Sequence, residues 1–210
     1  MSEATPEIRS LAPTDGAAAV EVLMDGFQTD PDMRWCFMAD AAGYEDRLRG
    51  YMETGHAWHT GLGFPVWAAY LAGELVGVSY EMRPDAVFPT EPELSLFTRM
   101  RPVCGDAAVD RFAQYNEEVD AATPDHPAHV VALLAVRGVD RGRGTGGRLL
   151  QRVIAEAGAD AAADGVMLAT GNPNNLPFYA RHGFEAVGRA TVGEITEHVL
   201  FRPCSDGDAS

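Results

Sequence analysis

The sequence has 210 residues, of which 46% are hydrophobic and 22% are charged, and its formal net charge is −15. No apolar run approaches the roughly 20 residues of a membrane-spanning helix, and the negative charge argues against a nucleic-acid-binding surface. All 16 basic residues are arginine, which excludes reactions that depend on lysine, such as Schiff-base chemistry. We expect one domain over residues 1–204, located in the cytoplasm because no apolar signal segment follows Met1, and a disordered acidic tail at 205–210.

The cysteines and histidines give little indication of a metal site. Three widely spaced cysteines fit neither a disulfide framework nor a zinc site, and we expect reduced thiols at Cys36, Cys104 and Cys204. His56 and His59 lie three residues apart on an expected helix, but the sequence places no third ligand beside them.

Strands and helices are predicted in alternation along the chain. Apolar runs predict strands at residues 7–11, 64–71, 75–81, 129–136, 166–170, 184–190 and 196–201. Helical spacing of apolar residues predicts helices after an N-cap at Asp15, at 44–59, at 94–122 with a break near 102–105, at 144–163 and at 174–182. The continuous apolar run at 129–136 is typical of a strand covered on both faces. The hairpins make some pairs antiparallel, whereas the strand–turn–helix–strand unit from His129 to Thr170 makes one pair parallel, so we predict a mixed α/β fold.

A glycine-rich turn follows the apolar run and leads into the helix expected at 144–163. It reads Arg141-Gly142-Arg143-Gly144-Thr145-Gly146, and we call it the glycine turn. Glycines at a helix entrance expose backbone N–H groups without partners in the helix, where the helix dipole adds about half a positive charge. Five arginines lie in this region, namely Arg137, Arg141, Arg143, Arg148 and Arg152. The turn therefore predicts a binding site for phosphate or pyrophosphate.

Two common phosphate-binding motifs do not fit the glycine turn. A P-loop needs a lysine after its last glycine, but Gly147 and Arg148 stand there. A Rossmann fingerprint needs the spacing G-x-G-x-x-G and an acidic residue after the next strand. Here the glycines fall as G-x-G-x-G, and the next strand ends in Ala169-Thr170.

The pattern L-x-V, followed by R-G-x-G-x-G, resembles the acetyl-CoA-binding motif of the GNAT acetyltransferase superfamily, with Gly138 where relatives usually carry proline. The segment from Asn175 to Phe184 is similar to the N-x-x-x-Y-x-x-x-G-F motif of the same superfamily, and the wording is most like the branch that contains puromycin N-acetyltransferase. The resemblance covers the C-terminal part of the chain, and the first 120 residues match only in the order of elements. It implies a GNAT fold, with a central mixed, mostly antiparallel sheet of six or seven strands flanked by helices and splayed at the central parallel pair.

The resemblance also implies how acetyl-CoA binds as a cosubstrate. Backbone groups of Leu134, Ala135 and Val136 would pair with the pantetheine arm in the gap of the splayed sheet. N–H groups of the glycine turn would hold the pyrophosphate, the residues being Arg141, Gly142, Arg143, Gly144, Thr145 and Gly146. Asn175 would bond the pantetheine arm or order the loop that covers it, and no metal is expected.

Acetyl transfer to an amine needs a neutral nucleophile, a donor to the oxyanion and a proton for the leaving thiolate. Tyr179 occupies the family's general-acid position, and a phenol with the ordinary pKa near 10 is protonated at neutral pH. The backbone N–H of Val136 is the expected oxyanion donor. The general base stays open: an ordered water is one candidate, and the side chains to consider are Glu81, His129, Glu117 and Glu118.

We therefore predict an N-acetyltransferase that moves acetyl from acetyl-CoA to a primary amine by direct attack in a ternary complex. The similarity to the puromycin N-acetyltransferase branch favours a small-molecule acceptor. Two alternatives stay open: acetylation of a protein N-terminus or lysine, and a non-catalytic acyl-CoA-binding sensor. We expect a monomer or homodimer with no nucleic-acid or membrane partner.

Overall fold

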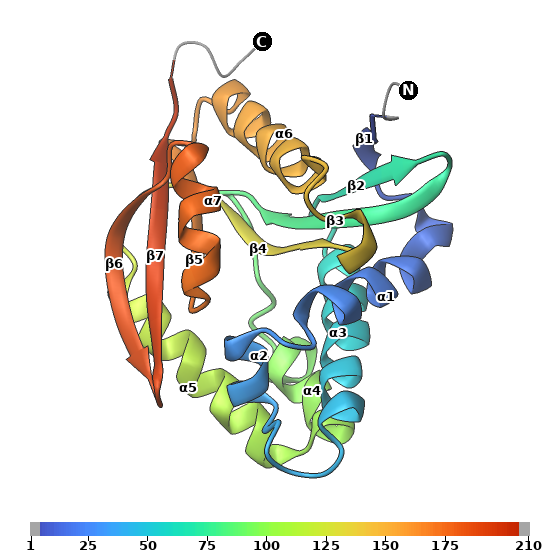
Figure 1. Cartoon of the computed structure of the whole chain (residues 1–210). Coiled ribbons are helices and arrows are strands. Elements are labelled where there is room, and N and C mark those ends of the chain that lie inside the picture. The colour runs from blue at the N-terminus through green and yellow to red at the C-terminus, as the bar shows by residue number, and fades with distance from the viewer. Residues whose placement is uncertain (1–4, 206–210) are drawn as a thin grey trace.

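The computed structural model describes residues 5–205, and its centre is a seven-stranded sheet (Figure 1). The strand order is β1-β2-β3-β4-β5-β7-β6. The strands are β1 (Glu7–Ser10), β2 (Val66–Leu71), β3 (Glu74–Met82), β4 (Ala128–Val136), β5 (Gly165–Thr170), β6 (Glu185–Val192) and β7 (Ile195–Pro203). Only β4 and β5 pair in parallel, and the other pairs are antiparallel, as predicted. Apart from Ser205, the tail expected at 205–210 lies outside the described residues.

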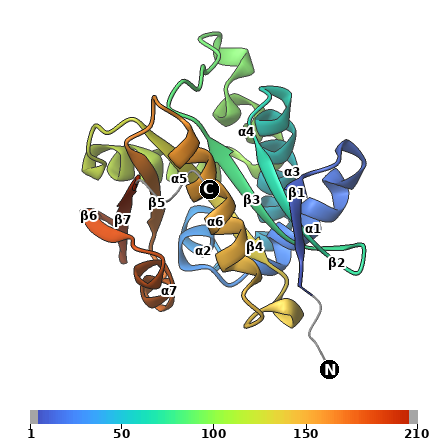
Figure 2. The same cartoon turned by 90° about the horizontal axis from the view of Figure 1, so that it is seen from above.

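Helices cover both faces of this sheet. They are α1 (Gly16–Phe27), α2 (Pro31–Cys36), α3 (Tyr44–Gly61), α4 (Leu96–Cys104), α5 (Asp106–Ala122), α6 (Thr145–Ala159) and α7 (Leu176–Arg181). Short 3-10 turns precede four of them, η1 (Pro13–Asp15), η2 (Pro92–Leu94), η3 (Gly138–Asp140) and η4 (Pro173–Asn175). Seen from above, α6 runs across the sheet near β4, with β5, β7 and β6 to one side and β3, β2 and β1 to the other (Figure 2). Helices α1 and α3 to α5 lie beneath the sheet (Figure 1).

Three details of the helices differ from the predictions, and the first is that α2 lies where no helix was predicted. Asp15 stands at the N-cap of α1 but makes no capping bond, because its carboxylate accepts a hydrogen bond of 2.5 Å from the hydroxyl of Tyr70 instead. Helix α6 ends at Ala159, short of the predicted 163. Asp160 adopts an extended backbone there, and its carboxylate bonds the backbone N–H of Ala162 and the ring of His129, which ends the helix.

The sheet opens between β4 and β5, and we call this opening the gap. The two strands pair only from Ala128 to Val130, opposite Gly165 to Met167, although both continue further. A bulge in β4 leaves Ala132 without a partner on β3 just where the pairing with β5 stops. Bulges bend a strand and end its pairing, so this one separates β4 from β5.

The gap changes the environment of the second half of β4. The sequence pattern predicts a strand covered on both faces, but Ala132 is exposed and Leu133, Leu134 and Val136 are only partly buried. These apolar side chains therefore line an opening as well as a core, a distinction that hydrophobicity alone does not make.

Candidate functional site

The backbone of β4 presents hydrogen-bonding groups to the gap. The N–H of Arg137 donates to the carbonyl of Val76 on β3 at 2.9 Å. Bonded residues alternate along an antiparallel ladder, so the N–H and C=O groups of Leu134 and Val136 point away from β3. With β5 splayed away, these groups face the gap, where an extended ligand can pair with them as a strand would.

The glycine turn joins β4 to α6 at the mouth of the gap. Gly142 and Gly144 have φ angles of +78° and +79°, in the left-handed region that glycine occupies without strain. Gly144 is the N-cap of α6 and no side chain caps the helix, so its first N–H groups are available to an anion. Asp140, just before the turn, is ion-paired with Arg137 at 3.0 Å and with Arg143 at 3.4 Å, which fixes the entry of the chain.

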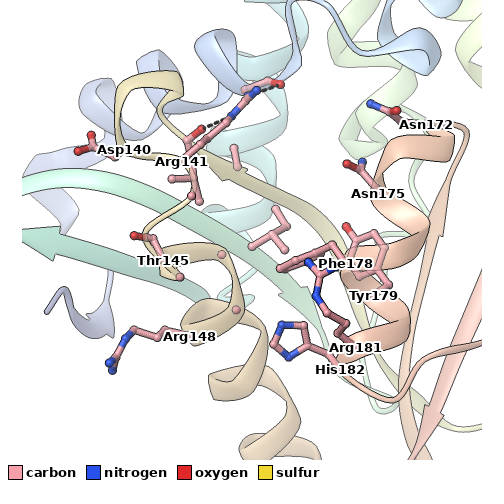
Figure 3. A pocket seen from close by; sticks show the side chains of 18 of the residues that line it. Asp140, Arg141, Thr145, Arg148, Asn172, Asn175, Phe178, Tyr179, Arg181 and His182 are labelled. Atoms are coloured by element: carbon pink, nitrogen blue, oxygen red, sulfur yellow. Dashed lines mark hydrogen bonds between the residues drawn. The ribbon is translucent and has the colours of Figure 1, made fainter.

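The glycine turn and the gap form one cavity of about 830 Å³ (Figure 3). Its walls come from β4, the glycine turn, the end of α1, the segment before α2, η4 and α7. The cavity includes these predicted cofactor residues: Leu134, Ala135, Val136, Arg141, Gly142, Gly144, Thr145, Gly146 and Asn175. Arg143 is not among the lining residues, because it turns to Asp140. The volume falls within the range of small-molecule and cofactor sites.

The cavity wall suits a long ligand that carries phosphate at one end. Three arginines contribute positive charge, Arg141, Arg148 and Arg181. A Cβ on Gly146 would lie 3.6 Å from Phe178 and 3.7 Å from Val136, so the missing side chain leaves a cradle between these two residues. The Arg141 guanidinium bonds the carbonyls of Val136 at 3.2 Å and Gly26 at 3.3 Å (Figure 3).

Tyr179 lies across the cavity from β4. Its ring packs edge-on against Phe178 and Phe184, with centroids 5.1 Å and 5.9 Å away. Burial, and to a smaller degree the charge of Asp30, raises the pKa of Tyr179 above its ordinary value of 10, so the phenol holds its proton at neutral pH. No protein group among residues 5–205 is hydrogen-bonded to its hydroxyl, which leaves that group free for a ligand.

Two asparagines complete the wall beside Tyr179 (Figure 3). The Asn175 amide donates to the Thr170 hydroxyl at 3.4 Å, which ties the start of α7 to the end of β5. Asn172 accepts from the N–H of Asn174 at 3.1 Å and so caps η4. Both residues line the cavity, although the sequence motif indicated only Asn175.

Glu81 and His129, two of the predicted bases, do not line the cavity. They form a buried network at the start of β4, where His129 Nδ1 lies 2.5 Å from Glu81 Oε1 and Trp67 donates to Glu81 Oε2 at 2.6 Å. Burial lowers the pKa of His129, but its hydrogen bonds to Glu81 and Asp160 outweigh that effect and raise it. The ring nitrogens of His129 and the carboxylate oxygens of Glu81 are thus bonded within this network and not at the gap.

The other predicted or considered side chains are also outside the cavity. Glu117 and Glu118 are exposed on α5. His56 bonds the hydroxyl of Tyr80 at 2.7 Å, and His59 bonds the carbonyl of Pro65 at 3.0 Å. Within residues 5–205, no group of three or more His, Cys, Asp or Glu side chains is arranged to hold a metal ion.

Four residues that line the cavity were not among the predicted site residues. They are Gly26 and Phe27 at the end of α1, and Thr29 and Asp30 before α2. A signal was present, because Asp30-Pro31 has the form of an N-cap followed by proline at the first helical position. Asp30 does cap α2, accepting from the N–H groups of Asp32 at 3.1 Å and Met33 at 3.5 Å.

Comparisons with known proteins support the predicted superfamily. Residues 118–202 match the family model of the acetyltransferase (GNAT) domain. A search of curated proteins gives no significant match. The fold is similar to that of a solved protein from Corynebacterium glutamicum described as histone acetyltransferase HPA2 and related acetyltransferase, with a TM-score of 0.70, 23% identity and coverage of 96% and 97% of the two chains.

Two further solved structures share the fold at lower identity. A GCN5-related N-acetyltransferase from Rhodopseudomonas palustris gives a TM-score of 0.59 at 16% identity, covering 97% of this chain and 98% of that chain. The ribosomal-protein-S18-alanine N-acetyltransferase from Escherichia coli gives a TM-score of 0.57 at 14% identity, covering 95% and 94%. Across the part of the chain that the structure describes, no helix is long and apolar enough to cross a membrane.

Proposed function

Starting from its placement in the GNAT acetyltransferase superfamily, we propose that this chain is an acetyl-CoA-dependent N-acetyltransferase acting on a primary amine of a small molecule. The observation that carries the proposal is the continuity of one cavity from the glycine turn, through the gap beside β4, to the hydroxyl of Tyr179. Residues 1–204 would act as one catalytic domain, located in the cytoplasm and present as a monomer or homodimer.

Each part of the cavity suits one part of acetyl-CoA, which would supply an activated thioester. The N–H groups at the start of α6, with Arg141 and Arg148, would hold the pyrophosphate. Backbone groups of Leu134 and Val136 would pair with the pantetheine arm, and Arg141 would have to release the Val136 carbonyl to allow it. Asn175 would position the same arm from the other side of the gap.

Two groups of the chain would act at the thioester. The Val136 N–H, which points away from β3, would donate to the acetyl carbonyl oxygen as negative charge develops on it. The Tyr179 hydroxyl would donate to the departing sulfur. Because burial raises the pKa of Tyr179, the phenol keeps its proton at neutral pH, and we expect it to pass that proton only as the sulfur becomes a thiolate. We assign no proton transfer to Glu81 or His129, since neither lines the cavity.

Substitution of Tyr179 tests this assignment. Tyr179→Phe should lower kcat by about 10²-fold or more, at the lower end of general-acid effects, while the acetyl-CoA-induced rise in stability is retained. At about 100 Kd of ligand that rise is roughly 2.7 kcal/mol. Tyr70→Phe is the matched control, because Tyr70 lies on β2 and bonds Asp15 outside the cavity. Full turnover by Tyr179→Phe would remove Tyr179 from the chemistry.

Two alternative functions would use the same cavity, and thiol-release assays distinguish them from acetylation of a small amine. Acetylation of a protein N-terminus or lysine would appear as thiol release with peptides but not with small amines. A non-catalytic acyl-CoA sensor would bind acetyl-CoA and release no thiol with any amine. The free hydroxyl of Tyr179 at the gap supports an enzyme over a sensor.

A further inference from the structure

Three carboxyl groups lie near one another where α2 begins, beside the end of β5. Asp30 lines the cavity. Asp32, on α2, is 7% exposed, and Glu197, on β7, is 0% exposed. A Cβ on Gly171 would collide with both Asp32 Oδ1 and Glu197 Oε1, so these two oxygens converge beside Gly171 at the end of β5. We call Asp30, Asp32 and Glu197 the acid trio.

Two members of the acid trio lack the hydrogen bonds that buried carboxylates usually make. Asp32 Oδ2 accepts from the N–H of Gly171 at 3.1 Å. Within residues 5–205 no group makes a hydrogen bond of good geometry to Asp32 Oδ1 or to either oxygen of Glu197, although the side chains of Asp32 and Tyr115 lie next to Glu197. Among residues 5–205, no arginine or histidine is ion-paired with any member of the trio. Buried polar groups are normally satisfied, so this arrangement indicates a place for protons or for a cationic ligand.

The surroundings of Asp30 favour uptake of a proton. The titratable and charged groups that face it or its neighbours are Asp32, Arg34 and Cys36 on α2, Tyr44 on α3, Arg111 and Tyr115 on α5, Tyr179 on α7 and Glu197 on β7. Burial, followed by the charge of Asp32, raises the pKa of Asp30 to about 7. Adjacent carboxylates cannot all ionise, so the charge of Asp32 increases the proton affinity of Asp30, the member of the trio that reaches the cavity.

We propose that Asp30 is the general base of the reaction, receiving the ammonium group of a cationic acceptor and taking its proton. This inference rests on the proposed acetyltransferase function. Asp30 and Tyr179 line the same cavity, and the charge of Asp30 acts on Tyr179, so an amine held by Asp30 would share the cavity with the group expected to serve the sulfur. Asp32 is a positioning residue that acts through Asp30.

The proton balance of the step is complete. One N–H bond of the ammonium breaks and its proton binds an Asp30 oxygen, which later returns it to solvent. The freed nitrogen lone pair forms the C–N bond to the acetyl carbon, and the C–S bond breaks with its electron pair on sulfur. The second proton lost by nitrogen ends on that sulfur, by way of Tyr179, so the products are an amide and a thiol.

Asp30→Asn tests the base while keeping the cap, because the asparagine oxygen can still accept the two N–H bonds at the start of α2. The probes are phenylalaninamide, an α-amine, and n-butylamine, an alkyl amine, with thiol release followed from pH 5 to 9. We expect Asp30→Asn to lose about 10²–10⁴-fold in kcat/KM and to lose the acid limb of the pH profile. Stabilisation by acetyl-CoA should match that of the unsubstituted protein.

Asp32→Asn separates positioning from a structural role. Its oxygen can still accept from Gly171, but the negative charge that raises the pKa of Asp30 is gone, so the acid limb should move to lower pH. Asp46→Asn, which removes an exposed carboxylate on α3, should leave the profile unchanged. A purely structural role for Asp32 would lower activity at every pH without moving the limb.

A titration of the protein without substrates distinguishes failure of the Asp30 inference from failure of the proposed function. The Asp30 carboxyl, followed by carbon NMR in the full chain, should titrate near pH 7 and at lower pH in Asp32→Asn. A titration near the ordinary value of 3.8, or an unchanged pH profile in Asp30→Asn, would overturn the inference. Acetyl-CoA binding without thiol release from either probe would instead refute the proposed function, and the titration would still report on Asp30.

Discussion

Glu197 should make the stability of this protein fall as pH rises, and Glu197→Gln should remove that dependence. Burial, followed by Asp32, raises the pKa of Glu197 from its ordinary 4.5 to about 9. Between these values the folded chain holds a proton that the unfolded chain has lost. The free energy of unfolding is therefore unaffected by Glu197 below about pH 4.5, falls steadily above it, and levels off once the pH passes about 9.

The magnitude follows from the size of the shift. At pH 7 the unfolded carboxyl is about 2.5 pH units above its pKa, and each unit is worth about 1.36 kcal/mol, so the ionisable side chain lowers stability by on the order of 3 kcal/mol. Glutamine has the same shape and never ionises. Its amide can also donate to Asp32 Oδ1, which has no partner in the native protein. We expect Glu197→Gln to raise the free energy of unfolding by about this amount at pH 7 and to change it little at pH 4.5.

Chemical denaturation at pH 4.5, 7 and 8 provides the assay, with Glu81→Gln as the matched control. Glu81 is as deeply buried as Glu197, but it is bonded to His129 and Trp67. Its replacement weakens a satisfied network and should destabilise the protein by about 1–3 kcal/mol. A flat pH dependence of the unsubstituted protein, or a loss of stability at pH 7 in Glu197→Gln, would refute the reasoning.

Two further predictions concern glycines whose surroundings differ. Gly146→Val should fill the cradle beside Phe178 and Val136 and abolish the thermal shift with acetyl-CoA, while stability without ligand stays within about 1 kcal/mol; an unaltered shift would contradict the placement of the ligand there. Gly165→Ala should destabilise by about 1–3 kcal/mol or more, because its Cβ would meet the Arg202 carbonyl and the Phe201 ring. A Cβ on Gly61, in α3, would have no neighbour within 4 Å, so Gly61→Ala should instead stabilise the protein by about 0.5–1 kcal/mol in the same denaturation series. Equal changes in stability for Gly165→Ala and Gly61→Ala would show that packing around the added Cβ does not decide the effect.

The C-terminal half of the fold was predictable because its signals are local. The glycine turn, the periodicity of α6 and the apolar run of β4 each lie within a short stretch of sequence. The motif from Asn175 to Phe184 placed Tyr179, and the structure brings that residue into the same cavity as Leu134 and Val136. The two segments meet because β4 and β5 are neighbours in the sheet.

The acid trio was not predictable because its members come from distant parts of the chain. Glu197 reads in sequence as one residue of an alternating strand, and Asp30 and Asp32 read as the polar start of a short helix. Only the packing of α2 against the ends of β5 and β7 brings them together. Conversely, Glu81 and His129 have the chemistry of a base, but the register of β3 on β4 places Glu81 opposite Val131, and its side chain bonds that of His129 near the start of β4.

The charges around the cavity suit the two substrates of opposite charge that the proposed reaction would use. The glycine turn, with Arg141 and Arg148, lies on one side of the cavity, and Asp30 lies on another, before α2. An anionic donor is therefore attracted to the first wall and repelled by the second, whereas a cationic amine experiences the reverse. The net charge of −15 draws small cations toward the molecule, and the local arginines restrict anion binding to the entrance of α6. In the proposed reaction this electrostatic pattern would help to orient donor and acceptor toward Val136 and Tyr179.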